Sequence, residues 1–499
     1  MSEFAKLLLP AIRWDTSKGY DPSRELIDLA LERGVGGFIL FGGESDAVRE
    51  LTAELRARSS VPLLIGADLE RGAGQQFSGA IGLPPLAAIA SLGDSSAITG
   101  AASLTAREAR TLGINWIYAP VCDLDIEPEN PIVGTRSLGA DPHAVGTAAA
   151  RWIEACQDAG VLACAKHFPG HGRTTVDSHA ELPTVSADAD TLAQTDVVPF
   201  ESAVDAGVAS VMTAHVSYPA FDASGAPATL SHTILQQMLR EDIGFPGLVV
   251  TDALIMEGVL GGGEATAVVN ALAAGCDLLL YPTNLVGCIE AIDAAVERGV
   301  LDRETLGLSL ERRGRWADWA NSERQPATVT NEDALWADQL CDRVVHRVRG
   351  ELSGHSAKLD VIVVDDDVGG PYPPPSREPF VDTLVAEGVN AQRSESPSGD
   401  SSASVVIALF GDIRSWKGRP GYSAASLARV HAALDAAAAA GQAVTIIQFS
   451  HPRLAKTIPG DSPVLCAWGG ERVMQRAAAR VFARTARSAT STHTTSFAR

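Results

Sequence analysis

The chain has few basic and few aromatic residues for its length. In 499 residues, 40 are Lys or Arg and 61 are Asp or Glu, which gives a formal net charge of −21, and aromatics make up 5%. Excess negative charge repels phosphate backbones and anionic lipid, so nucleic acid and membrane surfaces are disfavoured as partners. No apolar run approaches the roughly 20 residues that span a bilayer, and the opening MSEFAKLLLPAIRW lacks a secretory signal pattern.

The cysteines are few and scattered. There are seven, an odd number, and none forms a CxxC pair. A disulfide framework or a zinc site is therefore not expected. This usage predicts a cytoplasmic protein without a bound metal.

Eight short apolar runs alternate with Ala/Leu/Arg/Glu-rich stretches of helical spacing over the first 300 residues. Strands that are buried on both faces and separated by helices indicate parallel βαβ units. Eight such units predict a (β/α)8 TIM-type barrel, with a doubly wound sheet as the alternative. The runs are LLLPAIRW (7–14), GGFILF (36–41), PLLIGADL (62–69), INWIYAPV (114–121), VLACAKHF (161–168), ASVMTAHV (209–216), GLVVTDAL (247–254) and CDLLLYP (276–282).

Charged or polar residues recur at the carboxyl ends of these runs. A barrel carries its active site at that rim. Polar strand ends also arise simply from contact with solvent, but their repetition on strand after strand favours a shared site. The residues are Asp68, Asp123, Lys166, His167, His215 and Asp252.

The length predicts more than one domain. We expect a barrel domain over 1–320 and a connecting segment over 321–357, which is charged and then polar. Four further strand-like runs with intervening helices predict a smaller α/β domain with an open sheet over 358–490. A frayed tail is expected over 491–499.

The densest cluster of reactive side chains is KHFPGHGRTTVDSHAELP, at 166–183. Within it, Asp177 stands two residues before His179. A carboxylate beside an imidazole can hold its tautomer and raise its pKa, which makes a general acid/base near neutral pH. The alternative is a turn aspartate next to a surface histidine. The histidine spacing matches no common zinc pattern.

A second candidate is Asp252 in GLVVTDALIMEG, at the end of a predicted strand. A carboxylate fixed by a rigid strand at a barrel rim is well placed to act as a nucleophile. Capping of the strand end is the competing interpretation for a lone aspartate.

Taken together, the motifs resemble glycoside hydrolase family 3. The matching elements are ADLERGAG, INWIYAPVCDLD with GTRSLG, KHFPGHGRTTVDSHAELP, VMTAHVSYPAFD with PATLS, and GLVVTDALIMEG, in the family's order over most of residues 1–310. The KHFPGHG…DSH element looks like the β-N-acetylglucosaminidase branch, which uses an Asp-His pair as its acid/base.

The resemblance implies roles for individual residues. Asp252 matches the nucleophilic aspartate, and His179 matches the acid/base with Asp177 as its orienting partner. The matches to residues that bind the hydroxyls and N-acetyl group of the terminal sugar are Asp68, Arg136, Lys166 and His167.

One position departs from the branch. Gln76 stands eight residues after Asp68, where the branch usually has an arginine, and the glycine-arginine pair after the Glu is replaced by Arg71 and Gly72 in a shifted order. This departure affects the outer sugar contacts.

The resemblance therefore implies an exo-acting, retaining β-N-acetylhexosaminidase that acts on a small carbohydrate without a cofactor. Cleavage of terminal β-linked N-acetylglucosamine in cell-wall fragment recycling is the expected role. The alternatives are a β-glucosidase or β-xylosidase, an N-acetylglucosaminide phosphorylase of the same family, and an inactive sugar-binding protein. In the second domain, Arg414, Lys417 and Arg419 could meet an anionic leaving group, although a solvated loop is the favoured interpretation.

Overall fold

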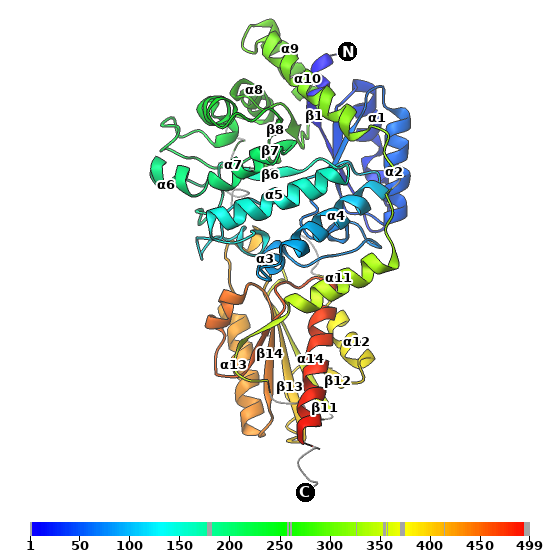
Figure 1. Ribbon diagram of the computed structural model, residues 1–499, viewed down its shortest axis with the longest axis vertical. Coiled ribbons are helices and arrows are strands. Elements are labelled where there is room, and N and C mark those ends of the chain that lie inside the picture. The colour runs from blue at the N-terminus through cyan, green and yellow to red at the C-terminus, as the bar shows by residue number, and fades with distance from the viewer. Residues whose placement is uncertain are drawn as a thin grey trace. The chain divides into compact units, whose positions relative to one another are not determined.

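The structure is a computed structural model that divides into two compact units (Figure 1). Unit 1 comprises 1–82 and 94–333, and unit 2 comprises 83–93 and 334–499. The structure describes residues 2–176, 182–256, 259, 262–325, 327–352, 356, 358–369, 375–413 and 415–493, with the backbone alone for 415 and 486–493.

Unit 1 is a barrel of parallel strands. Its ladders run β2-β3-β4-β5, β6-β7-β8 and β1-β9, and the bridges Trp116↔Leu162 and Val250↔Leu278 join them in a ring. Pro10, which has no amide hydrogen, separates β1 from β2 within one strand. The strands are β1 (Leu8–Leu9), β2 (Ala11–Arg13), β3 (Gly37–Phe41), β4 (Leu64–Ala67), β5 (Trp116–Ile117), β6 (Cys164–Phe168), β7 (Ser210–Thr213), β8 (Leu248–Val250) and β9 (Leu279–Leu280).

Helices connect the strands, and several begin at an acidic or amide cap. The side chains of Asp141, Asn284 and Asp302 each accept a backbone N–H in the first turn of the following helix. The longer helices of unit 1 are α1 (Arg24–Arg33), α2 (Ser45–Arg58), α4 (Ser95–Thr111), α5 (Pro142–Asp158), α6 (Ala189–Gln194), α7 (Val198–Asp205), the π-helix η6 (Thr233–Asp242), α8 (Glu264–Ala274), α9 (Leu285–Glu297) and α10 (Arg303–Ala320).

Each of the eight apolar runs supplies a strand of this barrel. The strands are almost entirely buried, because helices cover the outside and side chains fill the inside. The predicted fold class is confirmed: a closed barrel, rather than a doubly wound sheet, forms the first unit.

Unit 2 is an open six-stranded sheet in the order β10-β15-β14-β13-β11-β12, with β10 antiparallel to β15 and the other pairs parallel. One apolar cluster contains residues of α12 and α14, and a second contains residues of α13, so both faces are covered. The elements are α3 (Leu86–Ala90), β10 (His346–Arg349), β11 (Lys358–Asp365), α12 (Glu378–Ala386), β12 (Asn390–Ser394), β13 (Ala403–Phe410), α13 (Ala424–Ala439), β14 (Val444–Phe449), β15 (Val464–Cys466) and α14 (Arg472–His493).

The domain boundaries expected from the sequence stay a prediction, and the structure shows which elements lie near them. Helix α11 (Asn331–Val344) and strand β10 lie within 321–357, the expected connecting segment. The segment 83–93 belongs to unit 2, where Ala88 packs in the same core as Phe380. Helix α14 continues to His493, into the expected tail.

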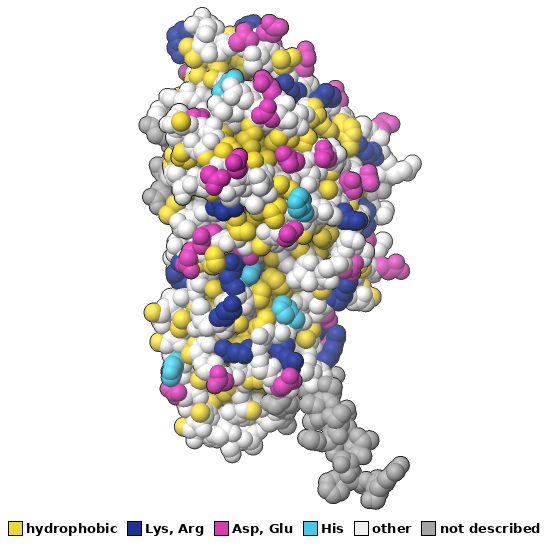
Figure 2. Space-filling view, turned by 60° about the vertical axis from the view of Figure 1, so that its left-hand side comes forward, with side chains coloured by type: hydrophobic (Ala, Val, Ile, Leu, Met, Phe, Trp, Pro, Cys, Tyr) yellow, Lys and Arg dark blue, Asp and Glu magenta, His cyan; other side chains and the backbone are white. Residues whose placement is uncertain are grey.

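The surface is that of a charged protein. Figure 2 shows acidic and basic side chains scattered over one face, with apolar side chains between them. Among the residues that the structure describes, no helix is long and apolar enough to cross a membrane. All seven cysteines are buried and free.

Candidate active site

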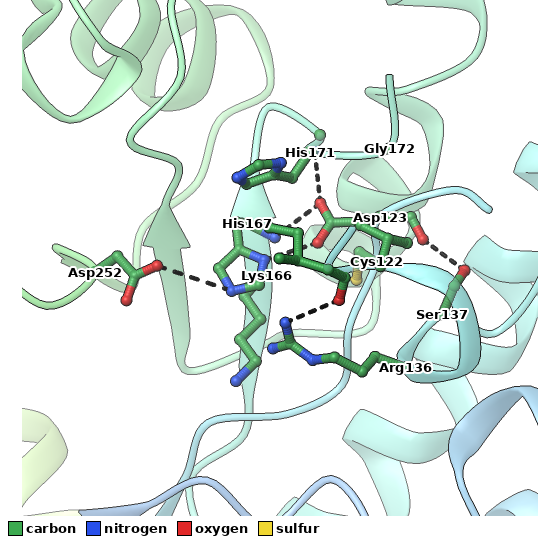
Figure 3. Close-up of polar contacts among 12 residues, drawn as sticks. Cys122, Asp123, Arg136, Ser137, Lys166, His167, His171, Gly172 and Asp252 are labelled. Atoms are coloured by element: carbon green, nitrogen blue, oxygen red, sulfur yellow. Dashed lines mark hydrogen bonds and ion pairs between the residues drawn. The ribbon is translucent and has the colours of Figure 1, made fainter. Parts of the chain in front are cut away.

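The carboxyl ends of β4, β5, β6 and β8 bring charged side chains together at one rim of the barrel (Figure 3). The backbone of β4 makes room for a neighbouring aromatic ring: a Cβ at Gly66 would stand 2.4 Å from the Tyr118 hydroxyl. Glycine is therefore required at this position, two residues before Asp68.

Lys166 lies at the centre of a buried network of charges. Its Nζ donates to Asp68 Oδ1 at 2.7 Å and lies 2.9 Å from Glu70 Oε1. Arg136 donates two hydrogen bonds to the same Glu70, from Nη2 to Oε1 at 2.8 Å and from Nε to Oε2 at 3.0 Å. Two carboxylates and two cations thus hold one another in fixed geometry.

The pKa values of Glu70, Lys166 and Arg136 keep these three groups charged. Burial alone would raise the pKa of Glu70, but the charges of Arg136 and Lys166 outweigh it and hold that pKa well below its usual range. Burial opposes the charged form of Lys166, yet Asp68 and Glu70 raise its pKa. The pKa of Arg136 is likewise raised, against burial, chiefly by Glu70.

Exposure separates the groups that could touch a ligand from those that support them. The side chains of Asp68 and Arg136 are 28% and 26% exposed, whereas that of Lys166 is 2% exposed. Asp252 is 24% exposed. Glu70 is also buried, and its ion pairs with Arg136 and Lys166 hold those two cations in place.

A second set of contacts orients His167. Asp123 is fully buried and accepts from the His167 backbone at 3.1 Å, while its other oxygen lies 2.7 Å from His167 Nδ1. The opposite ring nitrogen, Nε2, lies 4.0 Å from Asp252 Oδ2 (Figure 3). Burial opposes the charge on Asp123, but His167 and His171 lower its pKa. The carboxylate therefore fixes the imidazole with one nitrogen toward Asp252.

The turn after β6 is fixed by polar contacts of its own. His171 donates its backbone N–H to Asp123 at 2.6 Å, and its Nδ1 lies 2.7 Å from the Thr174 hydroxyl. Asn130 donates to the carbonyls of His171 and Gly172. Burial lowers the pKa of His171 to about 4, so this histidine is neutral at physiological pH.

The segment that carries Asp252 rests on His215. The ring of His215 is buried, with Nδ1 2.7 Å from the Thr229 hydroxyl and Nε2 3.2 Å from the Ala253 carbonyl. Ala253 donates its N–H to Asp252 Oδ1 at 2.7 Å. His215 therefore supports the backbone of the residue that follows Asp252.

Of the site residues predicted from the sequence, Asp68, Arg136, Lys166, His167 and Asp252 meet at this rim. Arg136 reaches the group through Glu70, which the sequence interpretation missed. Asp177 and His179 lie outside the described residues. The signal for Glu70 was its place two residues after Asp68 in ADLERGAG, since alternate residues of an extended segment point the same way.

The departure at Gln76 has a local structural role. Its side-chain oxygen accepts from the Gly42 backbone at 3.2 Å, which ties the segment after β4 to the end of β3. The neighbouring Gln75 accepts from the Arg71 backbone at 2.8 Å. The two glutamines thus secure loop geometry next to Asp68.

Among the described side chains, no group of three His, Cys, Asp or Glu is arranged to hold a metal ion.

The structure also shows the surroundings of two basic residues of unit 2, Lys417 and Arg419, which the sequence offered as possible contacts to an anionic leaving group. In unit 2 the Lys417 ammonium is buried beside Asp366 at 3.2 Å and Asp367 at 2.9 Å, and Arg419 pairs with Asp366. The favoured picture of a solvated loop is therefore wrong for Lys417. Arg414 lies outside the described residues.

Fold and site together define a barrel enzyme with a polar, charge-lined active-site rim. The comparison with protein families is specific: the glycosyl hydrolase family 3 N-terminal domain matches residues 3–313. The chain belongs to this family.

Individual relatives agree with this assignment. The chain is 38% identical to a β-hexosaminidase of Thiobacillus denitrificans over 66% of its own length and 90% of the relative's. It is 35% identical to a β-N-acetylglucosaminidase/β-glucosidase of Cellulomonas fimi over 56% of its own length, and it spans 52% of that relative. A family 3 β-N-acetylglucosaminidase structure from Paenibacillus sp. str. FPU-7 superposes with a TM-score of 0.84 at 27% identity, with 97% of each chain covered.

Proposed function

We propose that this protein is an exo-acting, retaining β-N-acetylhexosaminidase that removes terminal β-linked N-acetylglucosamine. The observation that carries the proposal is the fixed group Asp68, Glu70, Arg136 and Lys166, set beside the partly exposed carboxylate of Asp252. Charged hydrogen-bonding groups next to a strand-anchored carboxylate suit a sugar whose hydroxyls are bound while its anomeric carbon is attacked. The hexosaminidase names of the relatives support the same activity.

In the proposed mechanism, Asp252 attacks the anomeric carbon and forms the glycosyl-enzyme. His179, oriented by Asp177, protonates the departing oxygen and then activates the water that releases the sugar. The hydroxyls of the terminal sugar bind Asp68 and Arg136 at their open edges. Lys166 and His167, whose side chains are nearly buried, bind the same sugar at the bottom of the site.

We assign the enzyme to the cytoplasm and to cell-wall fragment recycling. Seven buried, free thiols suit a reducing compartment. Cell fractionation followed by identification of accumulated fragments in a strain without the protein tests this assignment.

A second candidate activity is β-glucosidase, because the Cellulomonas fimi relative carries both activities in its name. The two candidates differ at the N-acetyl group of the terminal sugar. A matched series of nitrophenyl N-acetylglucosaminide, glucoside and xyloside separates them by kcat/KM.

The decisive test combines trapping and mutation of Asp252. A 2-fluoro sugar should label Asp252 in the wild type, and Asp252→Asn should abolish turnover with an unchanged melting temperature. Asp205→Asn, which alters an exposed aspartate of α7, is the matched control. A label on another residue, or substantial turnover by Asp252→Asn, contradicts the assignment.

The acid/base and the acceptor require separate measurements. His179→Ala should reduce hydrolysis of a natural disaccharide about 10²–10⁴-fold more than that of a nitrophenyl sugar, because only the basic leaving oxygen needs protonation. Equal losses on the two substrates contradict the acid role. Products analysed in water and in phosphate buffer distinguish hydrolysis from phosphorolysis.

A further inference from the structure

Two of the sequence elements, VMTAHVSYPAFD and PATLS, contribute no residue to the proposed mechanism. Three of their polar side chains, those of Thr213, His215 and Thr229, are fully buried. A buried hydroxyl or imidazole is costly unless its hydrogen bonds are made, so the partners of these side chains show what they hold in place. We call the three residues the His215 network.

The His215 network is a row of hydrogen bonds that begins at strand β7. Thr213, the last residue of β7, has its hydroxyl oxygen 2.8 Å from that of Thr229. The same Thr229 oxygen lies 2.7 Å from His215 Nδ1, and the opposite ring nitrogen, Nε2, lies 3.2 Å from the Ala253 carbonyl oxygen. The network therefore reaches from the end of β7 to the residue after Asp252.

Backbone contacts bring Thr229 to this position. It lies in the short helix η5 (Ala228–Leu230), whose first residue donates its N–H to the Val216 carbonyl at 2.8 Å. Thr229 itself donates its N–H to the Ala214 carbonyl at 3.3 Å. The segment that carries η5 thus runs beside the segment after β7, and the Thr229 hydroxyl meets the His215 ring.

The partners determine which ring nitrogen of His215 carries the hydrogen. A carbonyl oxygen can only accept, so Nε2 donates to Ala253. In a neutral ring, Nδ1 must then accept, and the Thr229 hydroxyl donates to it. The Thr229 oxygen in turn accepts from the Thr213 hydroxyl. This order of donors selects the Nε2–H tautomer and fixes the plane of the ring.

The far end of the network anchors the backbone next to the proposed nucleophile. The peptide group between Ala253 and Leu254 is held at both ends, since its carbonyl accepts from His215 and its N–H donates to the Leu280 carbonyl of β9 at 3.1 Å. On the other side of Ala253, its own N–H donates to Asp252 Oδ1 at 2.7 Å. The orientation of the carboxylate is therefore tied to the position of Ala253.

The side chain of His215 takes over where strand pairing stops. The ladder between β7 and β8 ends at the pair Met212 and Val250, two residues before Asp252. Beyond that pair, His215 donates across to Ala253 as a backbone N–H of a neighbouring strand would. A buried ring with both nitrogens bonded is a rigid support for this purpose.

We propose that His215 is a positioning residue for the nucleophile, and that Thr229 and Thr213 act through it by fixing its tautomer. The inference rests on the proposed glycosidase function, in which Asp252 attacks the anomeric carbon. Attack requires reacting atoms about 3–3.5 Å apart in aligned geometry, so a small turn of the carboxylate slows formation of the glycosyl-enzyme. Binding of the sugar should change little, because the groups proposed to bind it stand elsewhere on the rim.

The test uses the 2-fluoro sugar that labels the nucleophile, because the kinetics of labelling separate the rate constant of attack from the binding constant. Two variants preserve opposite ends of the ring: glutamine carries its amide nitrogen near the place of Nε2, and asparagine near that of Nδ1. His215→Asn should lower the rate constant about ten- to hundredfold with little change in binding, since displacement of a reacting group by about 1 Å costs up to about 10²-fold. His215→Gln, which still donates to Ala253, should retain most of the wild-type rate constant.

A second pair of variants decides the question if the His215 variants fold poorly. Thr229→Val removes the hydroxyl at nearly constant shape and should lower the rate constant of labelling about two- to tenfold, the range for a neutral hydrogen bond, whereas Thr229→Ser should preserve it. Thr105→Val is the matched control. Thr105 is also buried, and its hydroxyl donates to the Ala101 carbonyl within α4. Its rate constant should equal that of the wild type.

The amount of label distinguishes positioning from general damage. If the network only stabilises the fold, mass spectrometry should show fewer labelled molecules, formed with the wild-type rate constant. That result overturns the proposal. Equal rate constants for His215→Asn and His215→Gln, or for Thr229→Val and Thr229→Ser, overturn it as well.

Failure of the proposed function gives a different result, because the wild type then neither turns over an N-acetylglucosaminide nor takes the label on Asp252. The hydrogen-bond network is still tested by NMR of the full chain with ¹⁵N-labelled histidine, in which the His215 signals are identified by their loss in His215→Gln. We expect a hydrogen on Nε2. A hydrogen on Nδ1 with none on Nε2 overturns the network itself.

Discussion

Glu70→Gln should be among the most damaging isosteric changes in the barrel. Glu70 is 5% exposed and receives two bonds from Arg136 and one close contact from Lys166. Glutamine keeps the shape, but it turns an NH2 group toward one of the two cations. Removing one partner from a buried ion pair costs about 3–5 kcal/mol. The surviving Asp68–Lys166 contact leaves Arg136 as the group that loses its carboxylate.

The pH dependence has a definite sign. Because the folded pKa of Glu70 is depressed, its contribution to stability is present above the usual value of 4.5 and is lost as pH falls through the folded pKa. The stability gap between wild type and Glu70→Gln should therefore be full at pH 7 and narrow only below about pH 4.5.

Glu108 is the matched control, a second buried glutamate with the opposite shift. Burial raises its pKa to about 7, against the opposing bond from the Ile81 backbone. An acid with this raised pKa loses up to about 3 kcal/mol of folding stability between pH 4.5 and 7. Glu108→Gln removes this loss, so the variant should be at least as stable as the wild type at pH 8.

Scanning calorimetry of the full chain at pH 4, 7 and 8 measures the unfolding of both variants. The unfolding transition that shifts in the variants is assigned to the barrel unit, since both substitutions lie there. The reasoning is refuted if Glu70→Gln costs less than about 1 kcal/mol at pH 7, or if Glu108→Gln costs more than Glu70→Gln. Kinetics at pH 7 provide a second reading, since a displaced Lys166 and Arg136 should raise KM for the terminal sugar.

Three further outcomes follow from the same contacts. Asp123→Asn should lower kcat/KM about ten- to hundredfold, because it removes a charge-assisted hydrogen bond to the His167 ring, and retention of wild-type kinetics would show that His167 needs no such partner. Burial lowers the pKa of His171 to about 4, so the wild type should lose up to about 3 kcal/mol of folding stability as pH falls from 6.5 to 4. His171→Gln should lack this loss when unfolding is measured by urea titration. Parallel curves of stability against pH for the two proteins would contradict the assignment. Lys417→Met should destabilise unit 2 by about 3–5 kcal/mol, because it leaves the buried carboxylates of Asp366 and Asp367 without their lysine. Arg429→Met, which removes an exposed ion pair with Glu395, should change stability by less than about 0.5 kcal/mol. Equal shifts in melting temperature for the two variants would count against the buried pairing.

The barrel could be predicted from the sequence because its strands are buried on both faces. Runs such as GGFILF and GLVVTDAL are apolar throughout, and parallel strands of this kind have few alternatives. Once the barrel is assumed, the carboxyl ends converge, and Asp68, Lys166, His167 and Asp252 must approach one another. Strands β10 and β12 were missed because HRVR and NAQRS are polar and partly exposed, without an apolar signal.

Other features of the site depend on geometry that alternation does not specify. Glu70 follows the end of β4, and its importance comes from Arg136, 66 residues away. Arg13 and Phe41 were counted only as members of apolar runs. Their pairing in register and the left-handed conformation of Tyr281 bring Arg13 into contact with both aromatic rings. A motif search that looks for known catalytic residues passes over such side chains.

Lys417 shows how strand order determines the meaning of a charged segment. Asp366 and Asp367 directly follow β11, and Asp412 follows β13. In the sheet these strands are neighbours, although β12 separates them along the chain. Three carboxylates thus meet at one sheet edge, and Asp412 pushes the pKa of Asp367 upward in addition to the effect of burial. Buried carboxylates at this density require a cation. The acidic run and the lysine are both visible in the sequence, but only the adjacency of β11 and β13 turns Lys417 from a surface residue into a counter-ion.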